Sequence, residues 1–411
     1  EAEAYGLAFQ GYSTQAAFFD YDRDGDLDVY LLNHSVHAEG TYEASELREV
    51  PHPRAGDRLY RNDPDSTRPG ARRFTDVSAE AGIYSGVVGY GLGVVVSDLN
   101  VDGCPDVYVA NDFHENDYLY YNDCDPDGSG QAPTFTESIR YATGHNSRSS
   151  MGVDAGDVNG DGLPDVVVLD MLPDREDIRK TSDEAEPLEI AELKVKFGYY
   201  HQYVRNMLQV NQGQGRFSEV GQLAGIAATD WSWAPLLADL DNDGRQDLFV
   251  TSGIYRRPND LDFVNVISRP DAQAALADGV DPEDLKYVDA MPQVRLPNHA
   301  FRNDGNLAFT DVGAAWGLDD DAFANGAAYA DLDGDGALDL VLNDFLPIEG
   351  TPVLGAGSDD LFGLAGTKDE FHMDFNKQEH NRPMDLGGLR SASAPARRPK
   401  SPTSVLGIPQ D

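Results

Sequence analysis

A nine-residue pattern rich in aspartate recurs five times in this chain of 411 residues and constrains its fold more than any other feature. The pattern D-x-[DN]-x-D-G-x-x-D starts at Asp20, Asp98, Asp157, Asp239 and Asp331. Positions 1, 3, 5 and 9 always carry a side-chain oxygen, and position 6 is always glycine. An acidic turn without a ligand, the simplest alternative, is disfavoured because unneutralised carboxylates this close together repel one another.

The oxygen atoms of each loop suit a hard cation. Position 7 varies freely, as expected where a residue contributes only its backbone carbonyl, and the glycine permits a sharp turn. Oxygens from positions 1, 3, 5, 7 and 9 would form the kind of cage that Ca²⁺ prefers. The sequence therefore predicts about five calcium sites. Their expected ligands are Asp20, Asp22, Asp24, Asp26 and Asp28; Asp98, Asn100, Asp102, Cys104 and Asp106; Asp157, Asn159, Asp161, Leu163 and Asp165; Asp239, Asp241, Asp243, Arg245 and Asp247; and Asp331, Asp333, Asp335, Ala337 and Asp339.

An EF-hand is the first alternative for such loops, but the flanking residues argue against it. An EF-hand loop ends in a bidentate Glu at position 12 and joins two helices. Here position 12 is apolar every time, as at Leu31, and runs such as VYLL, VYVA and LFVT follow the loops. These β-branched and aromatic runs have strand length, so we expect each loop to join two strands.

A second pattern follows each of the first four loops and predicts a β-hairpin. In every case a run ending in Asn precedes a short run beginning with Phe; the paired runs are 59–62 with 74–77, 119–122 with 135–137, 208–211 with 217–220, and 300–303 with 309–312. Each unit then contains four antiparallel strands, as in the blade of a β-propeller. The fold class predicted is therefore all-β, a β-propeller over residues 1–345 with five recognisable blades. An array of β-sandwiches would require linkers between domains, and none is evident.

The remaining segments are predicted to lie outside the blades. Residues 170–206 and 254–298 are read as insertions that contain helices, at EPLEIAELKVK and DAQAALADG, on one face of the repeat fold. Residues 346–411 are expected to be irregular and partly disordered, because their end is rich in Pro and Ser. No hairpin pattern follows the fifth loop, so the fifth blade is expected to be incomplete.

Composition excludes several classes of partner. The chain has 31 Lys and Arg against 72 Asp and Glu, a formal net charge of −41, which argues against nucleic acid and anionic membranes. No run of 18 apolar residues is present, so no transmembrane segment is expected. Cys104 and Cys124 could form one disulfide or remain two buried thiols. Because the first residue is Glu1, we expect a mature or trimmed segment.

The loops and their flanking strands resemble FG-GAP/VCBS repeats, the blade unit of the integrin α-subunit propeller. Longer stretches, GYSTQAAFFDYDRDGDLDVYLLN, NDFHENDYLYYN and DWSWAPLLADLDNDGRQDLFVTSG, are similar to bacterial relatives of cartilage acidic protein, the ASPIC/UnbV group. The resemblance covers roughly residues 10–345 and implies a secreted or cell-surface, calcium-binding propeller that typically has seven blades. This sequence departs from that group by showing five loops and no ASPIC/UnbV region after them.

Signals for catalysis are weaker. His114, Glu115, His145 and Arg148 could supply an acid, a base and a cation on one face, although hydrogen bonding within loops is the favoured interpretation and no catalytic residue is predicted firmly.

Two other groups of residues have alternative interpretations. Trp231 and Trp233 could stack on a sugar or, more simply, pack between blades. Arg256 and Arg257 could bind a carboxylate ligand, but a solvated pair is favoured.

These observations predict an extracellular or cell-surface calcium-binding repeat protein that is non-enzymatic and binds a protein or glycan partner in adhesion or recognition. The alternative is a carbohydrate-active lyase or hydrolase, or a lectin, built on the same propeller.

Overall fold

A computed structural model describes residues 2–35, 42–124, 132–182, 186–276 and 284–343 of the chain. Within them, four antiparallel sheets of four strands each follow one another along the sequence. Sheet 1 contains β1 (Ser13–Phe19), β2 (Asp28–Asn33), β3 (Arg58–Pro64) and β4 (Arg72–Asp76); sheet 2 contains β5 (Gly91–Ser97), β6 (Asp106–Asn111), β7 (Tyr118–Asn122) and β8 (Phe135–Glu137). Sheet 3 contains β10 (Gly152–Gly156), β11 (Asp165–Leu169), β13 (Met207–Asn211) and β14 (Phe217–Glu219); sheet 4 contains β15 (Ser232–Ala238), β16 (Asp247–Ser252), β18 (His299–Asn303) and β19 (Phe309–Asp311).

The predicted unit is confirmed in all four sheets, because each has the strand order first, second, third, fourth. Every aspartate-rich loop joins the first strand to the second, and position 9 of the pattern begins the second strand, as in the pairing of Phe19 with Asp28. The four hairpins predicted from the second pattern form the third and fourth strands. No EF-hand helix flanks these loops in the described residues.

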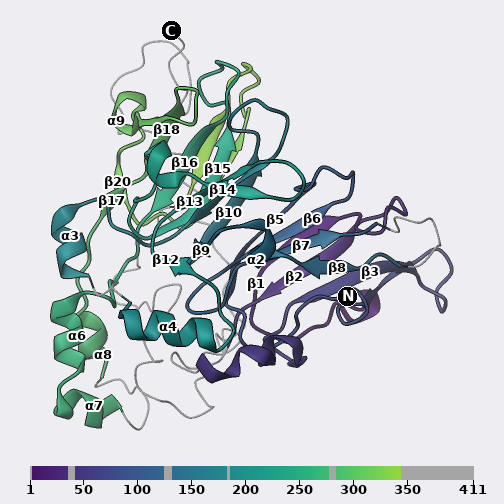
Figure 1. The fold of residues 1–411 in the computed structure, drawn as a ribbon, viewed down its shortest axis with the longest axis horizontal. Coiled ribbons are helices and arrows are strands. Elements are labelled where there is room, and N and C mark those ends of the chain that lie inside the picture. Colours follow the sequence, from purple (N-terminus) through teal and green to yellow (C-terminus); the bar gives the residue numbers. More distant parts are fainter. Residues whose placement is uncertain (1, 36–41, 125–131, 183–185, 277–283, 344–411) are drawn as a thin grey trace, which may run out of the picture.

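The sheets stack face to face in a row. The first strands of successive sheets lie beside one another, β1 with β5, β5 with β10 and β10 with β15. The fifth loop joins β21 (Ala327–Ala330) to β22 (Asp339–Leu342), a two-stranded sheet 5 whose β21 contacts β15. The chain thus passes from the purple sheet in Figure 1 through teal to the green end of the row.

The second strand of each inner sheet is buried on both faces. In β11, Val166 and Val168 pack into the core shared with sheet 2, whereas Val167 and Leu169 pack into the core shared with sheet 4. A strand covered on both sides has a continuous apolar sequence instead of an alternating one, which explains the run DVVVL. This packing of each sheet against two neighbours is propeller-like and does not fit an array of separate sandwiches.

Helices occupy the two predicted insertions. Between β11 and β13 lie α3 (Glu176–Thr181) and α4 (Leu188–Lys196), and between β16 and β18 lie α6 (Leu261–Ile267), α7 (Pro270–Leu276) and α8 (Leu285–Asp289). Both helices predicted from the sequence are confirmed, as α4 and α7. Because both insertions follow second strands, they leave the sheets at the end opposite the aspartate-rich loops, and Figure 1 shows these helices together on one side of the molecule.

The remaining elements are short. They are the helices α1 (Ala2–Tyr5), α2 (Ile139–Ala142), α5 (Gly221–Ala224) and α9 (Gly313–Trp316), the 3-10 helix η1 (Tyr42–Glu49), and the two-residue strands β9 (Asn146–Ser147), β12 (Gln202–Tyr203), β17 (Leu296–Pro297) and β20 (Asp321–Ala322). No helix in the described part of the chain has the length and hydropathy needed to span a bilayer. The tail predicted at 346–411 lies outside the described residues.

Candidate metal centres

All five loops share one backbone conformation, built around the carboxylate at position 1. In the first loop, Asp20 accepts hydrogen bonds from the backbone N–H of Asp24 at 3.0 Å and of Gly25 at 3.0 Å. The same two bonds recur at position 1 of the other four loops, from 2.8 to 3.1 Å. The carboxylate at position 5 in turn accepts from the backbone N–H of position 7, at 3.1 Å from Asp26.

Two positions of each loop lie in the left-handed region of backbone space. Glycine at position 6 has φ of 94° at Gly25, for example, where a side chain would be strained. Position 4 also has positive φ, including 61° at Val101, an unfavourable conformation for a β-branched residue. Backbone strain of this kind is found at ligand-binding loops more than elsewhere.

Position 9 is buried and connects the loop to the sheet. Asp165, with no exposed surface, accepts from the backbone N–H of Val158 at 3.0 Å and of Asn211 at 2.8 Å. Equivalent pairs of bonds reach Asp28, Asp106 and Asp247. Position 9 therefore joins its own loop to the third strand of the same sheet.

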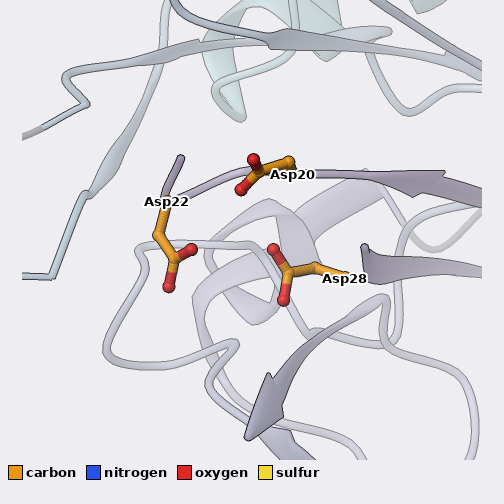
Figure 2. A group of neighbouring side chains, drawn as sticks. All are labelled: Asp20, Asp22 and Asp28. Atoms are coloured by element: carbon orange, nitrogen blue, oxygen red, sulfur yellow. The ribbon is translucent and has the colours of Figure 1, made fainter. Parts of the chain in front are cut away.

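The carboxylates of three loops converge. One oxygen from each of Asp20, Asp22 and Asp28 lies within 4.8 Å of the others, and Figure 2 shows these groups turned toward a common space. The same holds for two further trios, Asp239, Asp241 and Asp247, and Asp331, Asp333 and Asp339. In the second and third loops position 3 is Asn100 or Asn159, which offers an amide oxygen in place of a carboxylate.

Burial makes the position 9 carboxylates hard to ionise without a counter-charge. Desolvation raises the pKa of Asp28, Asp165 and Asp247 to about 6, partly offset by the backbone N–H donors. The pKa of Asp106 rises to about 7 for the same reason. A cation in the loop would reverse this effect by stabilising the ionised form.

The donor set fits a hard divalent cation. It consists of oxygen atoms, without histidine, and the side chain of Cys104 is bonded to Cys124 in a disulfide, so position 7 of the second loop has only its carbonyl to offer. Disulfide formation settles the alternative that the sequence left open. The side chain of Asp26 pairs with Arg72, and that of Arg245 pairs with Asp243, so these position 7 side chains are also directed to protein partners.

The candidate catalytic residues lie on the opposite end of the sheets and have separate partners. Glu115 is fully buried in an ion pair with Arg48 at 3.0 Å. The Nε2 atom of His145 lies 2.9 Å from Arg205 and 3.3 Å from Glu219.

The other two candidates are also held by neighbouring groups. The buried ring of His114 packs edge-on against that of Tyr199, with centroids 5.2 Å apart. The backbone N–H of Arg148 donates to Asp170 at 3.2 Å.

Two other groups are part of the core. Trp231 is buried with Met151 and Ile254, in keeping with packing between sheets. The expectation of a solvated arginine pair is wrong for Arg257, which is 2% exposed and donates to both oxygens of Asp230 at 2.7 and 3.2 Å. Two charge-assisted hydrogen bonds to one carboxylate compensate both charges and allow the pair to be buried. The partner was not recognised from the sequence because Asp230 lies 27 residues away.

One repeated residue that contacts the loops was not identified from the sequence. The asparagines at or near the ends of the third strands all donate their backbone N–H to position 9; they are Asn62, Asn122, Asn211 and Asn303. Their common place in the run before each hairpin turn was visible in the sequence, but nothing there indicated contact with the loops.

Comparison with known proteins agrees with the repeats. A family model described as FG-GAP-like repeat matches residues 98–168 and 199–250, which contain the second, third and fourth loops. No curated protein matches the chain.

A solved structure of an Agrocybe aegerita lectin, described by its specific recognition of non-reducing terminal N-acetylglucosamine, is 13% identical with a TM-score of 0.36. That match covers 80% of this chain and 60% of the lectin chain, so this chain spans less than two thirds of the lectin; a similarity this low carries no argument about fold or function. The family model thus detects FG-GAP-like repeats in two regions of this chain, and the loop geometry described above is consistent with such repeats.

Proposed function

We propose that this chain is a calcium-binding repeat protein in which each of the five loops holds one Ca²⁺. The observation that carries the proposal is the convergence of three carboxylates within 4.8 Å in the first, fourth and fifth loops. Five calcium ions would offset about ten of the negative charges in loops that belong to a chain of formal net charge −41. Positions 1, 3, 5 and 9, with the carbonyl of position 7, would hold the ion.

The role of the ions in this proposal is structural. Each ion would offset part of the negative charge of a loop that joins two strands and would order that loop. The position 9 carboxylate, which is bonded to the third strand, would extend this order to that strand. Binding to the folded chain alone stabilises it by mass action, by about 2.7 kcal/mol for each site at a free ion concentration 100 times the dissociation constant.

We further infer that the chain acts outside the cytosol as a recognition module for a protein or glycan. FG-GAP-like repeats and the Cys104–Cys124 disulfide support this proposal, since disulfides persist mainly in oxidising compartments. The helical insertions, at the end of the sheets away from the loops, offer the recognition face. Membership of the ASPIC/UnbV group is part of the same proposal.

The test is calcium titration together with thermal unfolding. Titration calorimetry of the metal-free chain should detect about five sites, and EGTA should lower the melting temperature by more than about 10 °C. Asp161→Ala should remove one site, whereas Asp320→Ala, an exposed carboxylate outside the loops, should leave the number unchanged. A melting curve that is identical in EGTA and in calcium would refute the proposal.

A further inference from the structure

In sheets 2, 3 and 4, the asparagine that ends the third strand is bonded to more than its own loop. Asn211 donates its backbone N–H to Asp165 at 2.8 Å and one side-chain N–H to the carbonyl of Pro164 at 2.9 Å, both in the third loop. Its side-chain oxygen accepts from the N–H of Gly213 at 2.9 Å. These bonds fix the orientation of the amide.

The second side-chain N–H crosses to the preceding sheet. Asn211 donates to the carbonyl of Leu99 at 2.8 Å, and Leu99 is position 2 of the second loop. The same bond recurs twice, from Asn122 to Tyr21 at 2.8 Å and from Asn303 to Val158 at 2.7 Å. The three asparagines are at most 2% exposed, so water does not compete for these bonds.

Position 2 is the residue through which such a bond would affect a metal site. The N–H of Leu99 donates to Asp106, position 9 of the same loop, at 2.8 Å. Its carbonyl belongs to the peptide group that leads into Asn100, the expected ligand at position 3. The amide of Asn211 therefore holds the peptide that lies between two ligands of the neighbouring loop.

Asn62 in sheet 1 is a natural comparison, because no sheet precedes it in the described chain. It donates its backbone N–H to Asp28 at 2.8 Å and its side-chain N–H to the carbonyl of Leu27 at 3.0 Å, both in its own loop. Asn62 is partly exposed. The bond to a neighbouring loop therefore occurs at three of these four asparagines.

We propose that Asn122, Asn211 and Asn303 are positioning residues that couple calcium binding at adjacent loops. This inference rests on the proposed calcium function. Metal binding at one loop orders its position 9, the asparagine bonded to it and, through the side chain, the preceding loop. The preceding loop then loses less conformational entropy when it binds its own ion, and by linkage the effect is reciprocal.

The first loop offers a specific signal for a test with terbium, which replaces Ca²⁺ in oxygen cages and emits when a nearby tyrosine is excited. Tyr21 stands at position 2 of that loop, where the other loops have Leu or Val. Emission that disappears in Tyr21→Phe therefore reports the first loop alone. Asn122→Ala removes the bond to this loop from the neighbouring sheet, and Asn211→Ala is the matched control, since its contacts lie in the second and third loops.

The proposal predicts that Asn122→Ala raises the terbium dissociation constant of the Tyr21-dependent signal about fivefold or more. Asn211→Ala should leave that constant within about twofold, as expected of independent sites. An unchanged constant in Asn122→Ala, or an equal rise in both variants, would overturn the coupling while leaving metal binding intact. Absence of the Tyr21-dependent signal in the unaltered chain would instead refute metal binding in the first loop, and the coupling with it.

Unfolding in saturating calcium verifies that each variant is folded. If Asn122→Ala does not fold, Asn122→Asp replaces it, because the carboxylate still accepts from Cys124, as the amide does at 3.0 Å, but cannot donate to Tyr21. The same rise of the dissociation constant is expected.

Discussion

At the scale of the residue, a polar side chain accepts the backbone N–H at the end of the second strand in each four-stranded sheet, at the end opposite the loops. Asp57 accepts the backbone N–H of Asn33 at 2.8 Å, and Asp117 accepts that of Asn111 at 2.9 Å. In sheets 3 and 4 the backbone N–H at the end of the second strand donates instead to a side-chain amide oxygen, that of Asn206 or Asn298. The fold therefore accepts either an acid or an amide at this position.

Burial gives the acid a pH dependence that the amide lacks. Desolvation raises the pKa of Asp57 to about 7 in the folded chain, so the folded state binds a proton more tightly than the unfolded state, in which the pKa is about 4. This contribution to stability is fully present below about pH 4 and is lost as pH rises through 7. Asp57→Asn should remove the loss, since the amide does not ionise.

At pH 8 the free energy of unfolding of Asp57→Asn is expected to be about 1–3 kcal/mol higher than that of the unaltered chain. This net gain includes the cost of losing the hydrogen bond that the Tyr30 hydroxyl donates to Asp57 at 2.9 Å. At pH 5 the gain should be much smaller. Urea unfolding in EGTA at both pH values measures the difference, with the exposed Asp320→Asn as control. An equal effect of Asp57→Asn at the two pH values would show that burial does not raise this pKa.

Single residues were predicted from the sequence where their role depends on local spacing. The aspartates at positions 1, 3 and 9 of the first, fourth and fifth loops lie close together, because they are separated by no more than eight residues in sequence. Arg257 and Asn211 were misjudged or missed, because their partners Asp230 and Leu99 lie 27 and 112 residues away and only the packing of sheets brings them together.

At the scale of the element, position 5 and position 9 of a loop differ in what they stabilise. Asp161 is exposed and bonds within the loop, whereas Asp165 is buried and accepts two backbone N–H groups, one from another strand. Removal of a buried acceptor leaves its donors unpaired, at a cost of about 1–3 kcal/mol each.

We therefore expect different behaviour of Asp161→Ala and Asp165→Ala. In EGTA, Asp161→Ala should unfold within about 1 kcal/mol of the unaltered chain, and Asp165→Ala should lose about 2–5 kcal/mol. In calcium, both should lose the stabilisation contributed by the third loop. Urea unfolding with and without calcium separates the two effects, and equal losses in EGTA would contradict the buried role of Asp165.

Strands and insertion helices were predictable for physical reasons. A strand buried on both faces has a short apolar run, as in β11, and the Asn and Gly residues of the hairpin turns separate the third strand from the fourth. The short elements α2, α5 and β17 were not anticipated, because two to four residues give no periodic pattern.

At the scale of the whole molecule, the sheets within the described residues form a row, and the first strands of its outermost sheets carry exposed aromatic side chains. Phe18 on β1 is 61% exposed and Tyr329 on β21 is 42% exposed, whereas the first strands between them lie beside other sheets on both sides. Local patterns predicted the unit and its repetition. They could not predict the number of sheets or whether the sheets close into a ring. Both depend on the angle between neighbouring sheets, which no single repeat determines.

The central claim is that each aspartate-rich loop holds one calcium ion, and crystals grown in calcium test it most directly. Anomalous difference density should show one ion in each of the five loops, bound by the oxygens of positions 1, 3, 5 and 9 and by the carbonyl of position 7. Loops that keep the same backbone conformation but contain only water at saturating calcium would contradict the account.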